Sequence, residues 1–444
     1  MVFLSLNGGG RRKRRQLPTS VEQLLANDYM LEHIISKIYG VEPNNVRRIR
    51  VRLNSQDDII KGHLSDSGRV SLTAELVDGL VITADWFLKV KPQTADDAKP
   101  IIGTRHFDVF NNEMNFYTKI LPAMQRLLVD TGLACQLSLD VPRILFCQQE
   151  EEQDTAILIL EDVYASGYRH IRDANGCKNL GPIEAVAALQ SLARIQAVFH
   201  VARNTAAAVS EFDSVWSSLA KSGMMWATQE SMVATLGELK ESFCRLLAQS
   251  SRPDAIQLMA RFCGSFRNLE DRLVELCEQR MGGVGHKPNN RIGDSLQHGD
   301  LHFNNIMFKK TASGELRVML VDWQLAYCGR HTGDVAYLLF SSVSRQQRLK
   351  HEAAVRAAHA AAYNDALKML LSSQQNLSCE PHNFINFMTE SVDVSLLRLP
   401  LLLACGNIMT AVEEEKDRTL EELTQKRISF AYEMCSEAVL RNII

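Results

Sequence analysis

Residues His298–Asp322 read HGDLHFNNIMFKKTASGELRVMLVD, and they carry most of what the chain reveals about its architecture. The first third of this segment is rich in polar side chains, and two apolar runs follow, Ile306–Phe308 and Leu316–Val321. Short apolar runs separated by a Gly-containing turn predict a β-hairpin. Such a hairpin would bring Asn305, before its first strand, close to Asp322, after its second.

The spacing H-x-D-x-x-x-x-N within this segment suits phosphoryl transfer. Asp300 can orient or deprotonate a hydroxyl group, and Asn305 can offer its amide oxygen to Mg²⁺. Asp322 can supply a carboxylate oxygen that joins the metal to nucleotide phosphates. Each residue alone is also typical of a turn or a helix cap. Together they predict a catalytic Asp300, a Mg²⁺ site at Asn305 and Asp322, and ATP as phosphate donor.

The bulk composition predicts an ordinary globular chain of more than one lobe. The chain has 444 residues, 46% of them hydrophobic, and a formal net charge of −3, which gives no reason to expect a nucleic-acid partner. Ten cysteines without a C-x-x-C pair predict reduced thiols rather than a zinc site, and therefore a cytoplasmic location. No uninterrupted apolar run reaches about 18 residues, so no membrane span is expected.

The chain is expected to divide into a tail and two lobes. A basic cluster, Arg11–Arg15, follows a short apolar start, which reverses the order of a signal peptide. It could be a nuclear-import or surface patch, but residues 1–20 fit a disordered basic tail better. Residues 21–160 predict an N-lobe of antiparallel strands with one helix. Residues 161–444 predict a helical C-lobe that holds the catalytic loop and the acceptor pocket, which gives an α+β fold.

Periodicity places the individual elements along the chain. The expected helices are Val21–Tyr39, Phe107–Leu128, Ala185–Arg203, Val335–Ser341, His351–Leu371 and Leu420–Leu440. The expected strands outside the hairpin are Arg47–Leu53, Arg69–Leu76, Leu80–Val90 and Ala156–Leu160, and Met281–Gln297 is expected to be a loop.

Two motifs resemble known kinase families. HGDLHxxN, from His298 to Asn305, resembles the catalytic loop of the aminoglycoside phosphotransferase and choline kinase group, which shares the protein-kinase fold. Protein kinases carry Arg and Lys where this chain has Gly299 and His302, so the resemblance implies a small-molecule acceptor. Leu158–Tyr168, LILEDVYASGY, is similar to the LxLEDL…GY signature of the ecdysteroid kinase-like family. DVAYLL, which begins at Asp334, is similar to that family's DLAYFL.

This resemblance, which runs from about Glu22 to the C-terminus, implies a two-lobed protein-kinase-like fold with ATP in the cleft. A Lys on the third strand should hold the α and β phosphates. Strand alternation puts Lys89 and Lys91 on the same face, and the family pattern selects Lys89, with Lys91 as the rival. The matching helix motif implies that Glu113 pairs with Lys89.

The remaining nucleotide contacts are assigned by position. The hinge near Glu161–Tyr164 should bind adenine through the carbonyl of Glu161 and the amide of Val163. Gly62, Ser65 and Ser67 could cradle phosphate. A plain hairpin turn at residues 66–68 is an equal alternative for that segment.

Three residues are expected to support the loop rather than to perform chemistry. The resemblance makes Asp334 the residue that binds the backbone of the catalytic loop, although it could also be the N-cap of the helix Val335–Ser341. His298 should support the loop from inside. His302 could lie near the γ-phosphate or be a buried supporting histidine.

The resemblance implies phosphorylation of a hydroxyl on an ecdysteroid or a similar hydroxylated lipid or xenobiotic, with no obligate protein partner. One alternative is an inactive kinase fold used for binding or scaffolding, but Lys89, Asp300, Asn305 and Asp322 are all present. Another is a choline- or aminoglycoside-type kinase with a cationic acceptor. That would need an acidic pocket, for which Glu413–Glu415 is a candidate, although a solvated helix face explains this run equally simply.

Overall fold

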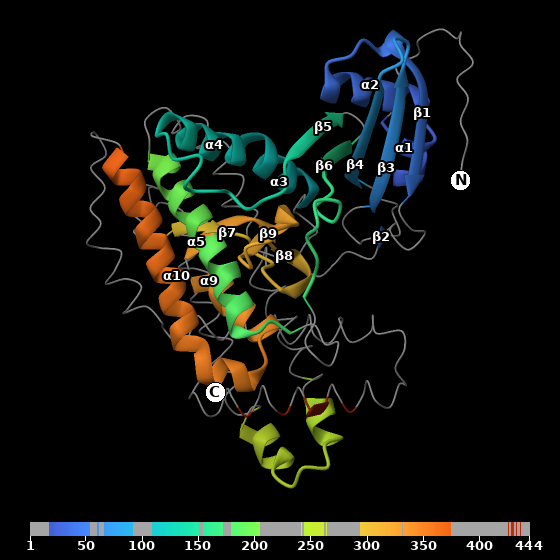
Figure 1. Cartoon of the computed structure of the whole chain (residues 1–444). Helices are drawn as coiled ribbons and strands as arrows, with labels where there is room; N and C mark the ends of the chain where they lie inside the picture. Colours follow the sequence, from blue (N-terminus) through green and yellow to red (C-terminus); the bar gives the residue numbers. More distant parts are fainter. Residues whose placement is uncertain are drawn as a thin grey trace, which may run out of the picture. The chain divides into compact units, whose positions relative to one another are not determined.

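The computed structural model describes most of the chain in two compact units (Figure 1). The described residues are 17–53, 60–61, 66–91, 109–150, 154–171, 179–204, 241, 244–261, 263, 294–330, 332–373, 425, 428–429, 432 and 436. Unit 1 comprises Met1–Ile101, Asp108–Thr118 and Val141–Arg169, and unit 2 comprises Ile102–Phe107, Lys119–Asp140 and His170–Ile444. The division therefore differs from a single boundary at residue 160, because Lys119–Asp140 belongs to unit 2.

Unit 1 is built on an antiparallel sheet with the strand order β1-β3-β4-β6-β5 and a short strand, β2, paired with β3. The strands are β1 (Val46–Leu53), β2 (Ile60–Lys61), β3 (Asp66–Leu76), β4 (Val81–Val90), β5 (Ile144–Glu150) and β6 (Thr155–Glu161). The meander expected between residues 47 and 90 is confirmed by the β1–β3 and β3–β4 pairings. Strand β5 was not expected.

The alternation of β4 decides which face of the sheet forms the core. Trp86, Leu88 and Val90 are buried in one cluster with residues of the helices α1 (Val21–Leu25) and α2 (Asp28–Tyr39). Residues between them in sequence, including Lys89, therefore lie on the opposite face. The division of β4 into two faces that the sequence predicts is confirmed.

The expected single helix Val21–Tyr39 is wrong, because two helices occupy this range. Ser20 caps α1 by accepting the amide of Gln23 at 3.2 Å, and Asn27 caps α2 by accepting the amide of Met30 at 3.1 Å. An internal Asn that satisfies a free helical N–H favours a new helix start over continuation. The expected tail also ends before residue 20, because Leu17 is buried in the core.

The expected helix Phe107–Leu128 is interrupted. Its described part consists of α3 (Val109–Asn115), a π-helical turn (Phe116–Ile120) and α4 (Leu121–Asp130). Pro122 stands in the first turn of α4, where its missing N–H costs nothing. A fresh helix start at this proline accounts for the local change in winding.

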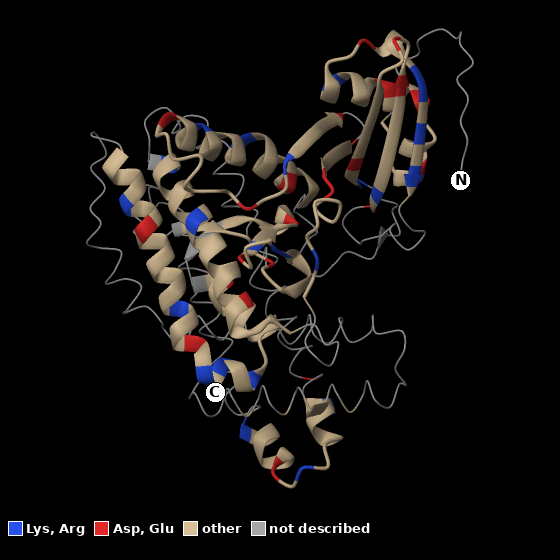
Figure 2. Cartoon of the chain, in the orientation of Figure 1, with Lys and Arg blue, Asp and Glu red and all other residues tan. Residues whose placement is uncertain are grey.

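The edge strand β1 is strongly basic (Figure 2). Arg47, Arg50 and Arg52 are exposed along it, and Arg50 forms an ion pair with Glu75 of β3 at 2.9 Å. Charged residues on an edge strand oppose pairing with other chains. These arginines therefore protect the open edge of the sheet.

Unit 2 is organised around the helix α5. Its elements are α5 (Pro182–Asn204), β7 (Asp294–Gln297), β8 (Ile306–Lys310), β9 (Leu316–Leu320), β10 (Tyr327–Arg330), α9 (Thr332–Ser342) and α10 (Arg345–Ser373). α5 packs against α10, α4, β9 and β7. Buried Gln196 of α5 donates to the carbonyl of Leu296 at 3.1 Å and contacts His359 of α10 at 2.9 Å, which links three elements.

By length and composition, α5 is also apolar enough to cross a membrane, which the sequence pattern did not lead us to expect. Of its most apolar window, 72% is buried inside the structure. Ser191 and Gln196 on this helix are fully buried and bonded to Asp140 and Leu296. These contacts are those of a core helix packed within unit 2.

The α+β class is confirmed, with an antiparallel sheet in unit 1 and mainly helices in unit 2. Asp294–Gln297 was expected to be a loop but forms β7, which pairs with β10. The predicted helices Ala185–Arg203 and His351–Leu371 correspond to α5 and α10. The expected helix Leu420–Leu440 and most of the range 201–296 lie outside the described residues.

Candidate active site

The catalytic loop is fixed between a short strand and a hairpin in unit 2. β7 leads into His298, a 3₁₀ turn covers Phe303–Asn305, and β8 pairs with β9 as the sequence predicts. The Val321 amide donates to the Asn305 carbonyl at 3.0 Å. Asn305 and Asp322 are therefore held at the open end of the same hairpin.

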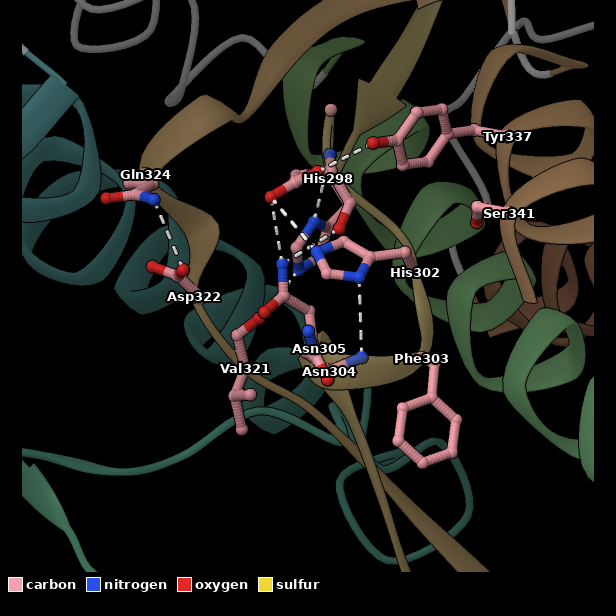
Figure 3. A network of polar contacts seen from close by, with 12 residues as sticks. His298, His302, Phe303, Asn304, Asn305, Val321, Asp322, Gln324, Tyr337 and Ser341 are labelled. Carbon is pink, nitrogen blue, oxygen red and sulfur yellow. Dashed lines mark hydrogen bonds and ion pairs between the residues drawn. The ribbon is translucent and has the colours of Figure 1, made fainter. Parts of the chain in front are cut away.

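Asp300 receives hydrogen bonds from several sides. Tyr337 donates its hydroxyl to Asp300 Oδ1 at 3.0 Å, and Asn305 donates Nδ2 to Asp300 Oδ2 at 3.1 Å and to its carbonyl at 2.9 Å. His302 Nε2 lies 3.4 Å from Oδ2. Figure 3 shows the side chains of His302, Asn305 and Tyr337 directed toward the same point. The carboxylate of Asp300 is therefore held in one orientation.

The charge state of Asp300 follows from opposing effects. Burial on its own would raise the pKa, but the nearby His302 and His298 and the bonds from His302 and Tyr337 together lower the pKa of Asp300 to about 2. The side chain is consequently a carboxylate at neutral pH, ready to accept a hydrogen bond from a hydroxyl group.

Tyr337 is a site residue that lies within a motif noted in the sequence but had no predicted role. It lies on α9, three residues after Asp334, so both side chains share one face of the helix. Burial and the proximity of Asp300 raise its pKa well above the usual value, so the hydroxyl stays protonated and can donate. The i, i+3 spacing was the available signal, but its target could not be read from the sequence.

The same helix binds the loop backbone at two further points. Asp334 accepts the amides of His298 and Gly299, the latter at 3.0 Å, and Ser342 accepts the Phe303 amide at 2.7 Å. Burial raises the pKa of Asp334 to about 7, against the effect of these two amide bonds. α9 begins at Thr332, so the alternative of Asp334 as its N-cap is wrong.

His298 joins the loop to the strand that delivers Asp322. Its Nε2 donates to the carbonyl of Val321 at 2.9 Å, and its Nδ1 accepts the amide of Asp300 at 3.3 Å. The ring is fully buried and lies 4.6 Å from the Trp323 ring, centre to centre. Burial lowers its pKa, and these two bonds require the neutral tautomer with the proton on Nε2.

Gly299 is required by its surroundings. Its φ is +84°, and a Cβ atom placed on it would lie 2.0 Å from the carbonyl oxygen of Leu325. The backbone of the loop thus packs against the turn Trp323–Leu325, which follows Asp322. This close packing gives a physical reason for glycine where protein kinases carry arginine.

Gly299→Ala is therefore expected to lower the free energy of unfolding by about 3 kcal/mol or more, because backbone strain and a steric clash add together. Chemical denaturation would measure the change. Gly314→Ala is the matched control, since Gly314 has a φ of +85° but no atom within 4 Å of an added Cβ. It should cost only about 1 kcal/mol. Equal losses in the two variants would contradict the assigned clash.

The two predicted metal ligands present oxygen atoms that suit Mg²⁺. Asn305 uses Nδ2 to donate to Asp300, which directs Oδ1 away as the atom that can bind a cation. Asp322 has a φ of +68°, which is unusual outside glycine, and accepts a bond from Gln324 at 3.2 Å. The described residues hold no cluster of three or more His, Cys, Asp or Glu side chains suited to a metal. A few protein oxygens completed by phosphate oxygens are typical of Mg²⁺ sites.

Lys89 and Glu113 meet in unit 1. Lys89 Nζ lies 2.8 Å from Glu113 Oε1 and 2.7 Å from Oε2, and the residues are 5% and 1% exposed. The rival Lys91 pairs instead with the exposed Asp154 at 2.5 Å. The contact between β4 and α3 that the resemblance implies is therefore present, while its role toward a nucleotide stays a prediction.

The expected phosphate-binding segment is only partly described. Gly62 and Ser65 lie outside the described residues. Ser67 is a buried residue of β3 and stands opposite Lys89 in the β3–β4 pairing, so both side chains project from the same face. The alternative of a hairpin turn at residues 66–68 is wrong, because these residues belong to β3.

The segment after β6 is held by an ion pair that the sequence did not predict. Arg69 of β3 binds the buried Asp162 through Nε at 3.0 Å and Nη2 at 3.0 Å, and its guanidinium lies 4.1 Å from the centre of the Tyr164 ring. Glu161 accepts the amide of Arg143 at 2.9 Å, and Val163 accepts that of Tyr168 at 3.0 Å. Adenine binding at Glu161 and Val163 stays a prediction.

These features define the class of the protein. The parts of a kinase-like phosphotransferase are all found: an aspartate held in a loop, an asparagine five residues later, a hairpin that ends at a second aspartate, and a buried Lys–Glu pair on an antiparallel sheet. A family model also matches residues 62–372, which is more than half of the chain. The chain belongs to the ecdysteroid kinase-like family.

Two solved structures illustrate how distant the structural relatives are. The GDP complex of wild-type aminoglycoside 2'-phosphotransferase-IIIa is 12% identical, with a TM-score of 0.36, over 93% of this chain and 99% of that chain. A microcompartment-associated aminopropanol kinase is 13% identical, with a TM-score of 0.35, over 93% of this chain and 97% of that chain. A comparison with curated proteins found no match.

Proposed function

We propose that this protein transfers the γ-phosphate of ATP to a hydroxyl group of a small molecule, either an ecdysteroid or a similar hydroxylated lipid or xenobiotic. The observation that carries the proposal is the ionised Asp300, held between Tyr337 and Asn305. A fixed carboxylate is the group that phosphoryl transfer to an alcohol requires beside the attacking oxygen. The family to which the chain belongs supports the choice of acceptor class.

In unit 2, the proposed roles follow from the atoms that each side chain leaves available. Asp300 orients the acceptor hydroxyl and accepts its proton. Asn305 Oδ1 and the carboxylate of Asp322 hold Mg²⁺, which supplies charge neutralisation at the phosphates when it is bound. His298 and Asp334 keep the loop in place and do not touch the substrate in this scheme.

In unit 1, the proposed nucleotide contacts centre on Lys89. Its ammonium group, oriented by Glu113, binds the α and β phosphates, and Ser67 beside it adds a hydroxyl donor. Adenine binds the backbone of Glu161 and Val163. A Mg-ATP-dependent reaction fits a cytoplasmic location, which is part of the proposal.

The function is tested by incubating the purified protein with Mg-ATP and a panel of ecdysteroids, other hydroxylated sterols and hydroxylated xenobiotics. Mass spectrometry should find a product that is heavier by one phosphate, about 80 Da, in at least one reaction. Thermal denaturation with and without Mg-ATP should show a higher midpoint with the nucleotide. A protein that shows neither product nor midpoint shift would be an inactive kinase fold, and the proposal would fail.

Tyr337→Phe tests the role of the hydroxyl that binds Asp300. The change deletes one hydrogen bond to a charged group, so kcat should fall about 10- to 100-fold while Mg-ATP binding stays the same. Tyr363→Phe, the same change at a fully buried tyrosine of α10, is the matched control and should leave kcat within a factor of two or so. An unchanged kcat in Tyr337→Phe would show that Asp300 is positioned without it.

A further inference from the structure

Two cysteine thiols lie in contact in the helical part of unit 2. The Sγ atoms of Cys244 and Cys263 are 3.0 Å apart, although 19 residues separate them in sequence. A disulfide bond is about 2.0 Å long, so a movement of about 1 Å between the sulfur atoms would suffice to form one. The ten cysteines were expected to be scattered single thiols, and these two depart from that expectation.

The backbone between them folds back on itself. Residues 244–248 and 255–261 are helical, and the turn between them contains bonds from the Gln249 amide to the Leu246 carbonyl and from the Ser250 amide to the Leu247 carbonyl, both at 3.1 Å. These two segments are the yellow-green helices in Figure 1. Leu247 and Ala255 are each only 1% exposed. The packed hairpin therefore sets the positions of both cysteines.

The other described cysteines provide a contrast. Cys135 is exposed, and Cys147 is half-buried with its pKa raised to about 11 by burial. A thiol with such a high pKa is a poor nucleophile at neutral pH. Cys135 and Cys147 therefore serve as internal references for single thiols in the same chain.

We infer that Cys244 and Cys263 are a modification site that forms a reversible intramolecular disulfide with glutathione disulfide as the oxidant. The thiolate of one cysteine attacks a sulfur atom of glutathione disulfide, which releases one glutathione and leaves a mixed disulfide. The second cysteine attacks the protein sulfur of that bond and releases the second glutathione. Two protein thiols are oxidised, one glutathione disulfide is reduced, and both protons leave with the thiolate products.

The hairpin that this disulfide would close is also a docking point for the C-terminal part of the chain. The guanidinium of Arg252 lies 4.3 Å from the centre of the Tyr432 ring, and the Tyr432 hydroxyl donates to Asp254. A covalent link across the hairpin restricts its unfolded forms and stabilises it. Oxidation would thus fix the support on which Tyr432 rests.

The test uses the full-length protein in buffers with different ratios of reduced glutathione to glutathione disulfide. Remaining thiols are alkylated, and tryptic peptides are analysed by mass spectrometry. The expected result is one linked peptide pair that contains Cys244 and Cys263, about 2 Da lighter than the reduced pair, appearing at a single midpoint. The oxidised protein should also unfold at a temperature about 5 °C higher than the reduced protein.

Serine variants show whether the two thiols depend on each other. In Cys244→Ser, Cys263 should accumulate only a glutathione adduct, and Cys263→Ser should give the reciprocal result. Cys135→Ser, at an exposed single thiol, should leave the linked peptide unchanged. Independent glutathione adducts on Cys244 and Cys263 in the unaltered protein, with no linked peptide at any ratio, would overturn the inference. The outcome does not depend on whether the protein transfers phosphate.

Discussion

Asp300→Asn is expected to lower the rate of phosphate transfer about 10³-fold and to leave Mg-ATP binding nearly unchanged. The amide keeps the shape of the carboxylate and can still accept the Tyr337 hydroxyl, so the loop should stay folded. It carries no charge, however, and cannot take the proton of the acceptor. A single-turnover assay of product, combined with calorimetric titration of Mg-ATP, separates the two quantities.

Two further variants make this prediction specific. Asp365→Asn removes the same charge from an exposed position on α10 and should leave the rate unaffected. Asp322→Ala should weaken Mg-ATP binding instead, because it deletes a proposed metal ligand. Near-normal turnover in Asp300→Asn would show that another group orients the acceptor.

The second large effect concerns the buried pair in unit 1. Lys89→Met should lower the free energy of unfolding by about 3–5 kcal/mol, because it leaves the carboxylate of Glu113 buried without its partner. It should also weaken Mg-ATP binding, since the proposed phosphate ligand is lost. Denaturant unfolding and nucleotide titration measure the two losses on the same protein preparation.

The double variant Lys89→Met/Glu113→Gln separates stability from function. Removing both charges should recover much of the lost stability without restoring nucleotide binding. Lys91→Met is the matched control: its partner Asp154 is exposed, and pairs of this kind contribute about 1 kcal/mol or less. Stronger loss of Mg-ATP binding in Lys91→Met than in Lys89→Met would transfer the phosphate-binding role to the rival lysine.

Local pattern was sufficient where an interaction depends on neighbours along the chain. The two faces of β4 follow from the two-residue period of a strand, which by itself separates Lys89 from Trp86, Leu88 and Val90. The hairpin β8–β9 follows from two apolar runs and the turn between them. Asp300 and Asn305 lie only five residues apart, so their contact is set largely by the conformation of one loop.

Elements were misjudged where a short-range competitor outweighed periodicity. The apolar spacing of Val21–Tyr39 is continuous, yet the Asn27 side chain starts a second helix. Similarly, Asp294–Gln297 follows a Gly- and Asn-rich segment and resembles a loop in sequence, but its pairing with β10 makes it a strand. Strand pairing is a tertiary contribution that no local window contains.

The sequence was therefore enough to give the α+β class, the hairpin and the types of residue that phosphoryl transfer needs, because each depends on a repeat or a spacing along the chain. Only the tertiary structure decided that Tyr337 binds Asp300 across 37 residues and that Gly299 has no room for a side chain beside Leu325. It also decided that Cys244 meets Cys263. These contacts depend on how separate elements pack, and packing is set by the shapes and burial of many residues together.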